Sequence, residues 1–251
     1  MLLKVCLNGR RGADEHPAVP ITPGQLADAS RRSVEVGAEA VHLHPRNESG
    51  IETLAAAEVG AAIAAVRRAV GAPVGVSTGA WIEADPERRA SLVRRWGGLE
   101  SGQRPDFASV NLFEDGWRDV FEALLESGIG VEAGLWSPED ARRLVEDGLA
   151  GRCLRLLLEP VRETSAEAAL ESACEMGRVL DDSGVEAPRL LHGKDATAWP
   201  VLRHATGEGY GMRIGFEDVL TLPDGGVASD NARLVAAARE ISLAPGEDAA
   251  R

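Results

Sequence analysis

The chain has 251 residues, of which 44% are hydrophobic and 4% aromatic, and its formal net charge is -13. This length allows one (β/α)8 barrel or two smaller domains. The acidic balance disfavours nucleic acid as a partner, because contacts with phosphates need a basic surface. The sequence has neither a run of apolar residues long enough for a membrane span nor the pattern of a signal peptide. Its three cysteines, Cys6, Cys153 and Cys174, form no zinc-binding or disulfide framework, so we expect a cytoplasmic protein without a membrane partner.

Short β-branched or apolar runs alternate along the chain with amphipathic stretches rich in Ala, Leu, Arg and Glu. The runs predict strands at 2–9, 40–45, 74–79, 107–113, 130–136, 153–160, 189–193 and 212–218. The amphipathic stretches predict helices at 23–37, 54–70, 86–96, 117–127, 138–148, 166–183, 196–207 and 231–241. Several helices begin with a capping residue followed by proline, as at Thr22, Asp85 and Ser137.

Eight strands and eight helices in strict alternation predict a single (β/α)8 TIM barrel that spans residues 1–251 as one domain. No linker, charge block or low-complexity segment divides the chain. A doubly wound open sheet is the structural alternative. That fold would favour a glycine-rich phosphate loop after the first strand, and Asn8-Gly-Arg-Arg-Gly12 does not have that pattern.

His42 and His44 form a His-x-His motif at the end of the second predicted strand. Residues i and i+2 of a strand point to the same face, so the two imidazoles leave the backbone side by side. An isolated His-x-His is often incidental. In a (β/α)8 barrel, however, functional groups lie at the carboxyl ends of the strands, which is where this motif falls.

A metal site with an open position needs a third protein ligand beside the two imidazoles, and a carboxylate is one known solution. Glu217 is the favoured third ligand, because it lies at the end of the last predicted strand, which neighbours the first strand when the barrel closes. Glu132 and Glu159 remain alternatives, and His192 could be a fourth ligand. His16 and His204 fit surface or packing positions better.

Other polar groups also fall at strand ends and would converge on one cleft. If the ligand is anionic, its positive partners must be local, and each of the candidates lies near a strand end: Arg10, Arg11, Arg46, Lys194 and Arg213. Arg10 and Arg11 would favour an anionic or polar substrate tail. Trp81, Trp136 and Trp199 could form walls or lids, although packing is the commoner role of such residues.

Over most of its length the sequence resembles the beta-keto acid cleavage enzymes. The resemblance rests on the segments 20–23 (PITP), 37–46 (GAEAVHLHPR), 76–79 (VSTG), 109–111 (SVN), Glu132, 213–218 (RIGFED) and 229–231 (SDN). The chain is shorter than typical members, and it differs from them after the first strand and at the end of the seventh.

This resemblance implies a (β/α)8 barrel, a homo-oligomer (dimer or tetramer) and a Zn2+ ion held by His42, His44 and Glu217. It implies that a beta-keto acid reacts with acetyl-CoA to give acetoacetate and a new CoA thioester. Asp218 would be the general base and Arg213 would orient it, although an ion pair that closes the barrel would use the same two residues. The expected substrate-binding residues are Arg46, Ser77, Gly79, Ser109, Asn111 and Glu132.

Two other functions remain open on the sequence. A zinc-dependent lyase or hydrolase could use the same metal and base without CoA. A non-catalytic barrel that binds a metal or a metabolite is a third reading, which the Arg213–Asp218 pair beside an open ligand set disfavours.

Overall fold

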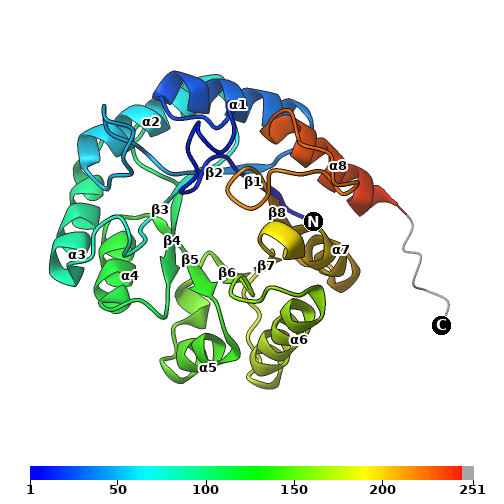
Figure 1. Ribbon diagram of the computed structural model, residues 1–251. Helices are drawn as coiled ribbons and strands as arrows, with labels where there is room; N and C mark the ends of the chain where they lie inside the picture. Colours follow the sequence, from blue (N-terminus) through cyan, green and yellow to red (C-terminus); the bar gives the residue numbers. More distant parts are fainter. Residues whose placement is uncertain (245–251) are drawn as a thin grey trace, which may run out of the picture.

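The computed structural model describes residues 1–244 and contains a closed barrel of eight parallel strands in the order β1 to β8, each followed by a helix (Figure 1). The predicted fold class is therefore confirmed. The strands are β1 Leu3–Cys6, β2 Ala40–Leu43, β3 Val74–Ser77, β4 Phe107–Asn111, β5 Gly130–Leu135, β6 Arg155–Leu158, β7 Arg189–Leu191 and β8 Gly211–Ile214.

The helices form a ring around the barrel (Figure 1). They are α1 Pro23–Glu35, α2 Ala56–Ala69, α3 Pro86–Arg94, α4 Trp117–Glu126, α5 Pro138–Glu146, α6 Ala166–Asp182, α7 Ala198–Glu208 and α8 Asn231–Leu243. The expected start signals act as caps: the Thr22, Asp85 and Ser137 side chains accept backbone N–H groups of α1, α3 and α5. A proline follows each cap, where its missing N–H costs no helix hydrogen bond.

The strands are shorter than the sequence predicts, mainly at their carboxyl ends. β2 ends at Leu43 and β8 ends at Ile214, so His44 and Glu217 lie in the loops that follow. The apolar pattern continues past the last ladder hydrogen bond, because residues at the rim stay buried after they leave the sheet. Strand ends therefore could not be read from burial alone.

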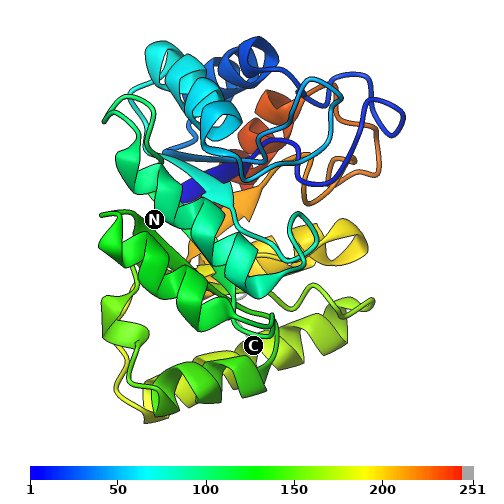
Figure 2. The same cartoon turned by 90° about the vertical axis from the view of Figure 1, so that its left-hand side faces the viewer.

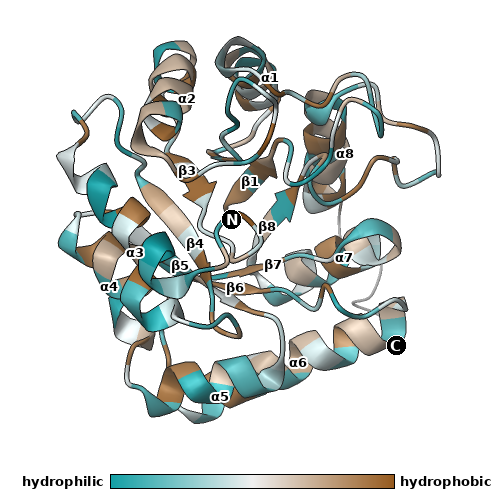
Figure 3. Ribbon diagram, turned by 60° about the vertical axis from the view of Figure 1, so that its left-hand side comes forward, coloured by the Kyte–Doolittle hydropathy of each residue, from teal (hydrophilic) through white to brown (hydrophobic). Residues whose placement is uncertain are grey.

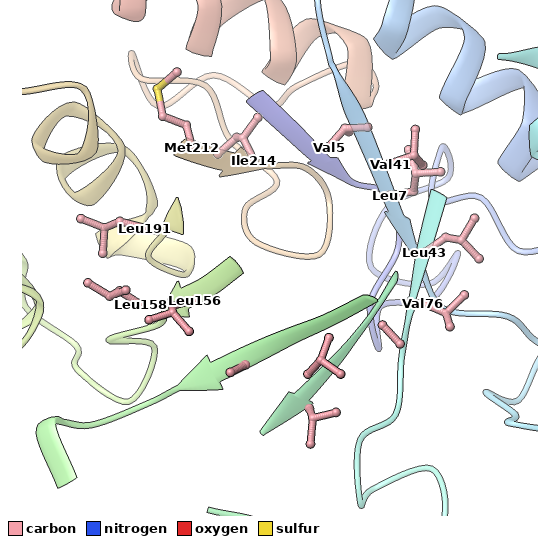
Figure 4. Close-up of a cluster of buried hydrophobic side chains, with 14 of the residues drawn as sticks. Val5, Leu7, Val41, Leu43, Val76, Leu156, Leu158, Leu191, Met212 and Ile214 are labelled. Carbon is pink, nitrogen blue, oxygen red and sulfur yellow. The ribbon is translucent and has the colours of Figure 1, made fainter. Parts of the chain in front are cut away.

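The apolar core lies between the barrel and the ring of helices. Alternate residues of the strands point outward, and Figure 4 shows Val5, Val41 and Ile214 among such side chains. All three are fully buried. Figure 3 shows hydrophobic residues concentrated on the strands and hydrophilic residues on much of the helix surface. Burial of this apolar layer stabilises the fold and leaves the inward positions available for other side chains.

The interior of the barrel is polar and charged. Lys4 of β1 reaches across to Glu132 of β5, with 2.6 Å between Nζ and Oε2, and both side chains are fully buried. Arg155 of β6 lies 3.2 Å from the other carboxylate oxygen of Glu132. Glu132 therefore faces two cations, the buried Lys4 and the part-buried Arg155.

The loops at the carboxyl ends of the strands extend to one side of the molecule. Figure 2 shows the loop after β1 (dark blue) and the loop after β8 (orange) on that side. Asn231 joins the segments, because its side chain donates to Leu7 O and accepts from Phe216 N, with distances of 2.9 and 2.8 Å.

Cys6, Cys153 and Cys174 are free thiols. Within residues 1–244, no helix has both the length and the apolar character that a bilayer crossing requires.

Lys4→Met is predicted to lower the free energy of unfolding by about 3 kcal/mol or more, because it leaves Glu132 buried with only part of its compensating charge. Urea unfolding followed by circular dichroism measures the change. The matched control is Lys194→Met, since Lys194 is the only other lysine of the chain and is exposed. Equal stability of Lys4→Met and the wild type would show that the pair is dispensable for folding.

Candidate metal centre and active site

A cavity of about 440 Å³ opens at the carboxyl ends of the strands. Of the residues expected from the sequence to form a site, it is lined by His42, His44, Ser77, Ser109, Asn111, Arg213, Glu217 and Asp218. Trp81 and Trp136 also line it. The barrel therefore brings residues from four strands (β2, β3, β4 and β8) and from the loops that follow strands to one mouth.

His42, His44 and Glu217 form a group in which one ligand atom from each lies within 4.8 Å of the others. The Nε2 atoms of His42 and His44 lie 3.7 and 3.4 Å from Glu217 Oε2. Two ligands at about 2.1 Å from one ion can be no more than about 4.2 Å apart, so both distances suit a shared ion. Within the described residues, His44 Nε2 and Glu217 Oε2 are buried and have no hydrogen-bond partner. A metal ion would satisfy both atoms.

The protonation states of these groups also suit a cation. Burial lowers the pKa of His42 well below its ordinary value, which leaves the neutral imidazole that metals require. Burial would raise the pKa of Glu217, but Arg213 and the two imidazoles hold it well below its usual range, so the carboxylate is ionised. Burial would lower the pKa of His44, yet the Glu217 and Glu52 carboxylates raise it to about 9, so a metal ion that binds this imidazole would displace a proton. Positive charge is therefore favoured between these side chains.

Two glycines allow Glu217 to approach the histidines. Gly215 has a φ of +156°, and a Cβ there would lie 2.1 Å from Cys6 O. The chain after β8 can thus press against β1, where Glu217 N donates to Cys6 O at 3.2 Å. Gly9 has a φ of +54°, and a Cβ there would lie 2.4 Å from Glu217 Cγ. Any larger residue at either position would displace the carboxylate.

Glu52 was not predicted as a site residue, yet its carboxylate binds Nδ1 of His44. This contact favours the proton on Nδ1 and leaves Nε2 free to bind a metal. Asn8 fixes the same residue through its backbone, because it accepts from His44 N and donates to His44 O at 2.9 Å each. Glu52 reaches His44 because its loop folds back in an antiparallel bridge with Arg46. No local sequence pattern predicts that this loop folds back.

Trp81 covers the Glu52–His44 contact. Its ring stacks on His44 with 6.2 Å between centroids, and its Nε1 donates to Glu52 Oε1 at 3.3 Å. A Cβ on Gly79 would meet the Trp81 ring at 2.3 Å, so this glycine makes room for the indole.

Arg213 and Asp218 form a buried pair beside the metal-type group. Arg213 Nη2 lies 2.8 Å from Asp218 Oδ1 and 2.6 Å from Glu217 Oε1, so one guanidinium holds both carboxylates. Its Nε also donates to Asp218, at 3.1 Å to Oδ1. The ion pair that the sequence suggested is therefore present, and Asp218 still lines the cavity.

His192 and Glu159 are also brought into the cavity wall, as a pair. His192 Nε2 lies 3.0 Å from Glu159 Oε2, and its Nδ1 lies 3.6 Å from Asp218 Oδ1. Neither residue belongs to the group of His42, His44 and Glu217. The geometry thus favours Glu217 over Glu159 as the third ligand, and gives His192 a carboxylate partner instead of a metal.

Three of the expected substrate-binding residues do not line the cavity. Glu132 lies in the charged cluster with Lys4. Gly79 donates its N–H to Ser77 Oγ at 3.2 Å. Arg46 donates to the carbonyl groups of Gly9 and Gly50, each at 2.9 Å, and so ties the loops after β1 and β2 together.

The loop arginines differ in their partners. Arg11 forms ion pairs with Glu15 and Asp195. Arg10 and Lys194 line the mouth and form no ion pair with any residue in 1–244. Arg10 lies over the Trp81 ring, 6.0 Å from its centroid.

The remaining histidines and Trp199 lie outside the cavity lining. His16 packs against Phe216 with 4.5 Å between ring centroids. His204 belongs to α7, where its Nε2 lies 3.5 Å from Cys174 Sγ. Trp199 donates from Nε1 to Thr221 O at 2.8 Å. These contacts agree with the packing or surface roles that the sequence suggested.

The fold and the site define a (β/α)8 barrel protein with a His/His/Glu group at the carboxyl ends of its strands. The chain belongs to the beta-keto acid cleavage enzyme family, whose model matches residues 1–251. Among curated proteins, no sequence matches this chain.

Solved structures with a similar fold include two of ObcA. A ternary complex of ObcA with a C4-CoA adduct and oxalate has a TM-score of 0.72 and 19% identity, and the match covers 89% of this chain and 63% of ObcA. A binary complex of ObcA with oxaloacetate has a TM-score of 0.70 and 18% identity, with the same two coverages. The match therefore spans less than two thirds of the ObcA chain. The 3-hexulose-6-phosphate synthase of Salmonella typhimurium has a TM-score of 0.59 and 15% identity, with 97% and 99% coverage.

Glu52→Gln is predicted to weaken zinc binding about tenfold. The amide can still accept from His44 Nδ1 but lacks the charge that supports the imidazole as a ligand, and loss of such partners costs roughly 10- to 100-fold in affinity. Competition with a chromophoric chelator gives the dissociation constant.

Two further variants serve as the unaffected and the metal-free controls for this measurement. Glu48→Gln removes an exposed carboxylate from the same loop and should leave zinc affinity unchanged. His42→Ala removes a proposed ligand and should abolish zinc retention on elemental analysis. Full zinc content in His42→Ala would exclude the proposed metal centre.

Proposed function

We propose that the protein is a zinc-dependent beta-keto acid cleavage enzyme that condenses a beta-keto acid with acetyl-CoA and releases acetoacetate and a new CoA thioester. The observation that carries this proposal is the His42–His44–Glu217 group with the Arg213–Asp218 pair beside it in one cavity. Membership of the family supports the reaction class. His44 Nε2 and Glu217 Oε2, which are buried without a hydrogen-bond partner among the described residues, support a bound cation.

His42, His44 and Glu217 would hold the zinc ion. When bound, zinc would supply Lewis acidity toward the ketone and carboxylate oxygens of the substrate. Asp218 is the proposed base that removes a proton from C2, the carbon between these two groups. Arg213 holds both oxygens of Asp218 and would aim the carboxylate at that carbon. The same guanidinium binds Glu217, so the proposed base and ligand share one anchor.

Ser77, Ser109 and Asn111 are proposed to contact the substrate beyond the metal, because all three line the cavity. Ser77 Oγ accepts the Gly79 N–H, which leaves its hydroxyl proton available for a substrate carboxylate. Arg46, Gly79 and Glu132 are proposed to act on the substrate only through the residues that they support, since none of them lines the cavity.

The use of acetyl-CoA is supported by the cations at the mouth. Arg10 and Lys194 are exposed there without an ion-pair partner among the described residues, and CoA carries several phosphate charges. ObcA, which shares the fold, has been solved with a CoA adduct and with oxaloacetate. We also propose that the protein is cytoplasmic and that it forms a homo-oligomer, either a dimer or a tetramer.

Incubation of the zinc-loaded protein with a panel of beta-keto acids tests the reaction. We expect acetoacetate and a new CoA thioester, both detected by mass spectrometry, only when acetyl-CoA is present. Cleavage without acetyl-CoA would identify a CoA-independent lyase or hydrolase. Absence of turnover on the whole panel would favour a binding protein.

Asp218→Asn is predicted to keep zinc but to lower kcat by about 10²- to 10⁴-fold, the usual contribution of a positioned base. Zinc content and steady-state rates measure the two effects separately. Retention of zinc shows that the neighbouring ligand Glu217 is still in place. Near-normal turnover would reassign the base.

A further inference from the structure

The cavity wall formed by β4, β5 and β6 carries two oxygen acceptors on buried residues, and neither oxygen forms a hydrogen bond with a described residue. They are Oδ1 of Asn111 and Oε1 of Glu159, from residues that are 6% and 5% exposed. Both residues line the cavity. Their strands lie across the barrel from β1 and β2, so this wall lies away from the His42–His44 side.

Glu159 is fixed by His192. The imidazole Nε2 forms a hydrogen bond with Oε2 of the carboxylate at 3.0 Å, which leaves Oε1 as the free oxygen. Burial would raise the pKa of Glu159, but His192 and then Arg213 lower it, so the carboxylate is ionised. Glu159 thus presents a charged acceptor in a fixed orientation.

Asn111 is fixed by Glu114. Its Nδ2 donates to Glu114 Oε1 at 2.8 Å, so the amide oxygen must point away from that carboxylate. Glu114 is buried as well, and Arg89 Nη2 lies 3.9 Å from its other oxygen. The hydrogen bond to Glu114 therefore sets the orientation of the Asn111 amide.

Gly134 of β5 leaves the space between the two oxygens open. A Cβ at Gly134 would lie 2.6 Å from Asn111 Oδ1 and 2.9 Å from Glu159 Oε1. Both oxygens are thus about one hydrogen-bond length from the same point. Two acceptors that converge on one space repel each other unless a donor lies between them.

We propose that this pair of oxygens is the subsite for the R group of the beta-keto acid, and that it selects R groups that carry a hydrogen-bond donor, a hydroxyl or an ammonium. This inference rests on the proposed function, because it places the keto acid at the metal side and its R group toward β4–β6. The two acceptors disfavour an anionic R group, so of the anionic or polar tail that Arg10 and Arg11 suggested, only the polar alternative agrees with this subsite.

A matched set of 3-oxo acids tests the proposal. Their R groups have equal length and carry a methyl, hydroxyl, ammonium or carboxylate group. Each group is placed in turn at successive carbons of the R group, because the depth of the subsite determines which carbon lies opposite the two oxygens. At the best position we expect kcat/KM for a donor-bearing acid to exceed that of the methyl acid by about 100-fold, since sites built for a donor reject analogues without one. The carboxylate acid should be the poorest. Equal kcat/KM across the set would overturn the inference, while turnover of the methyl acid with acetyl-CoA would still support the proposed function.

Binding measured by calorimetry with the zinc-loaded protein tests the subsite separately from turnover. If no acid reacts, the proposed function fails, but tighter binding of the donor-bearing acids would still support this subsite. Equal binding of all acids would reject it.

Two variants test the oxygens directly. Glu159→Gln removes the charge and should lower kcat/KM for the ammonium acid at least tenfold more than for the methyl acid, with a smaller effect on the hydroxyl acid. Gly134→Ala places a methyl group between the acceptors and should reduce the preference for both donors. Glu163→Gln is the matched control, because it lies in the same loop after β6 but outside the cavity lining, and its ratios should equal those of the wild type. A purely structural role of Glu159 would lower all rates in parallel and would contradict the proposal.

Discussion

The ionised carboxylate of Glu217, held between Arg213 and two imidazoles, is the interaction on which the mouth of the barrel depends. One oxygen accepts from Arg213 Nη2 at 2.6 Å, and the other faces His42 and His44 without a hydrogen-bond partner in the described chain. Closure of the barrel makes this possible, because β8 pairs with β1 and β1 pairs with β2. An open sheet would place the last strand far from the histidines.

The alternation of side chains along each strand separates stability from chemistry. Outward residues such as Val5 and Val41 bury apolar surface under the helices, while the inward Lys4 and His42 carry charge or metal-ligand chemistry. The buried charge of Lys4 inside the barrel is tolerated because Glu132 lies opposite it and forms an ion pair with it. Toward the mouth, His44 Nε2 and Glu217 Oε2 have no hydrogen-bond partner in the described chain, and both residues line the cavity.

The fold and one half of the site could be predicted from the sequence. Hydrophobic periodicity and helix caps predicted all eight strands and helices of the described chain, and the i, i+2 spacing placed His42 and His44 on one face. The partners that orient these groups could not be predicted. Glu52 approaches His44 only after its loop folds back, and Glu132 joins Lys4 across the barrel. Both contacts depend on tertiary geometry and leave no local pattern.

On both walls of the cavity, the chain's own hydrogen bonds satisfy only part of the polar atoms of the lining side chains. At the metal side, Glu52 and Arg213 occupy the outer atoms of His44 and Glu217 and leave the inner atoms for a cation. At the opposite wall, His192 occupies the outer oxygen of Glu159, and the inner oxygen stays free. The same arrangement therefore occurs twice: a buried partner fixes one end of a side chain so that its other end is available to a ligand. A substrate that spans the cavity would need an electron-rich end toward the cation and a donor toward the acceptors, so the chain's own hydrogen bonds define the polarity of the molecule it accepts.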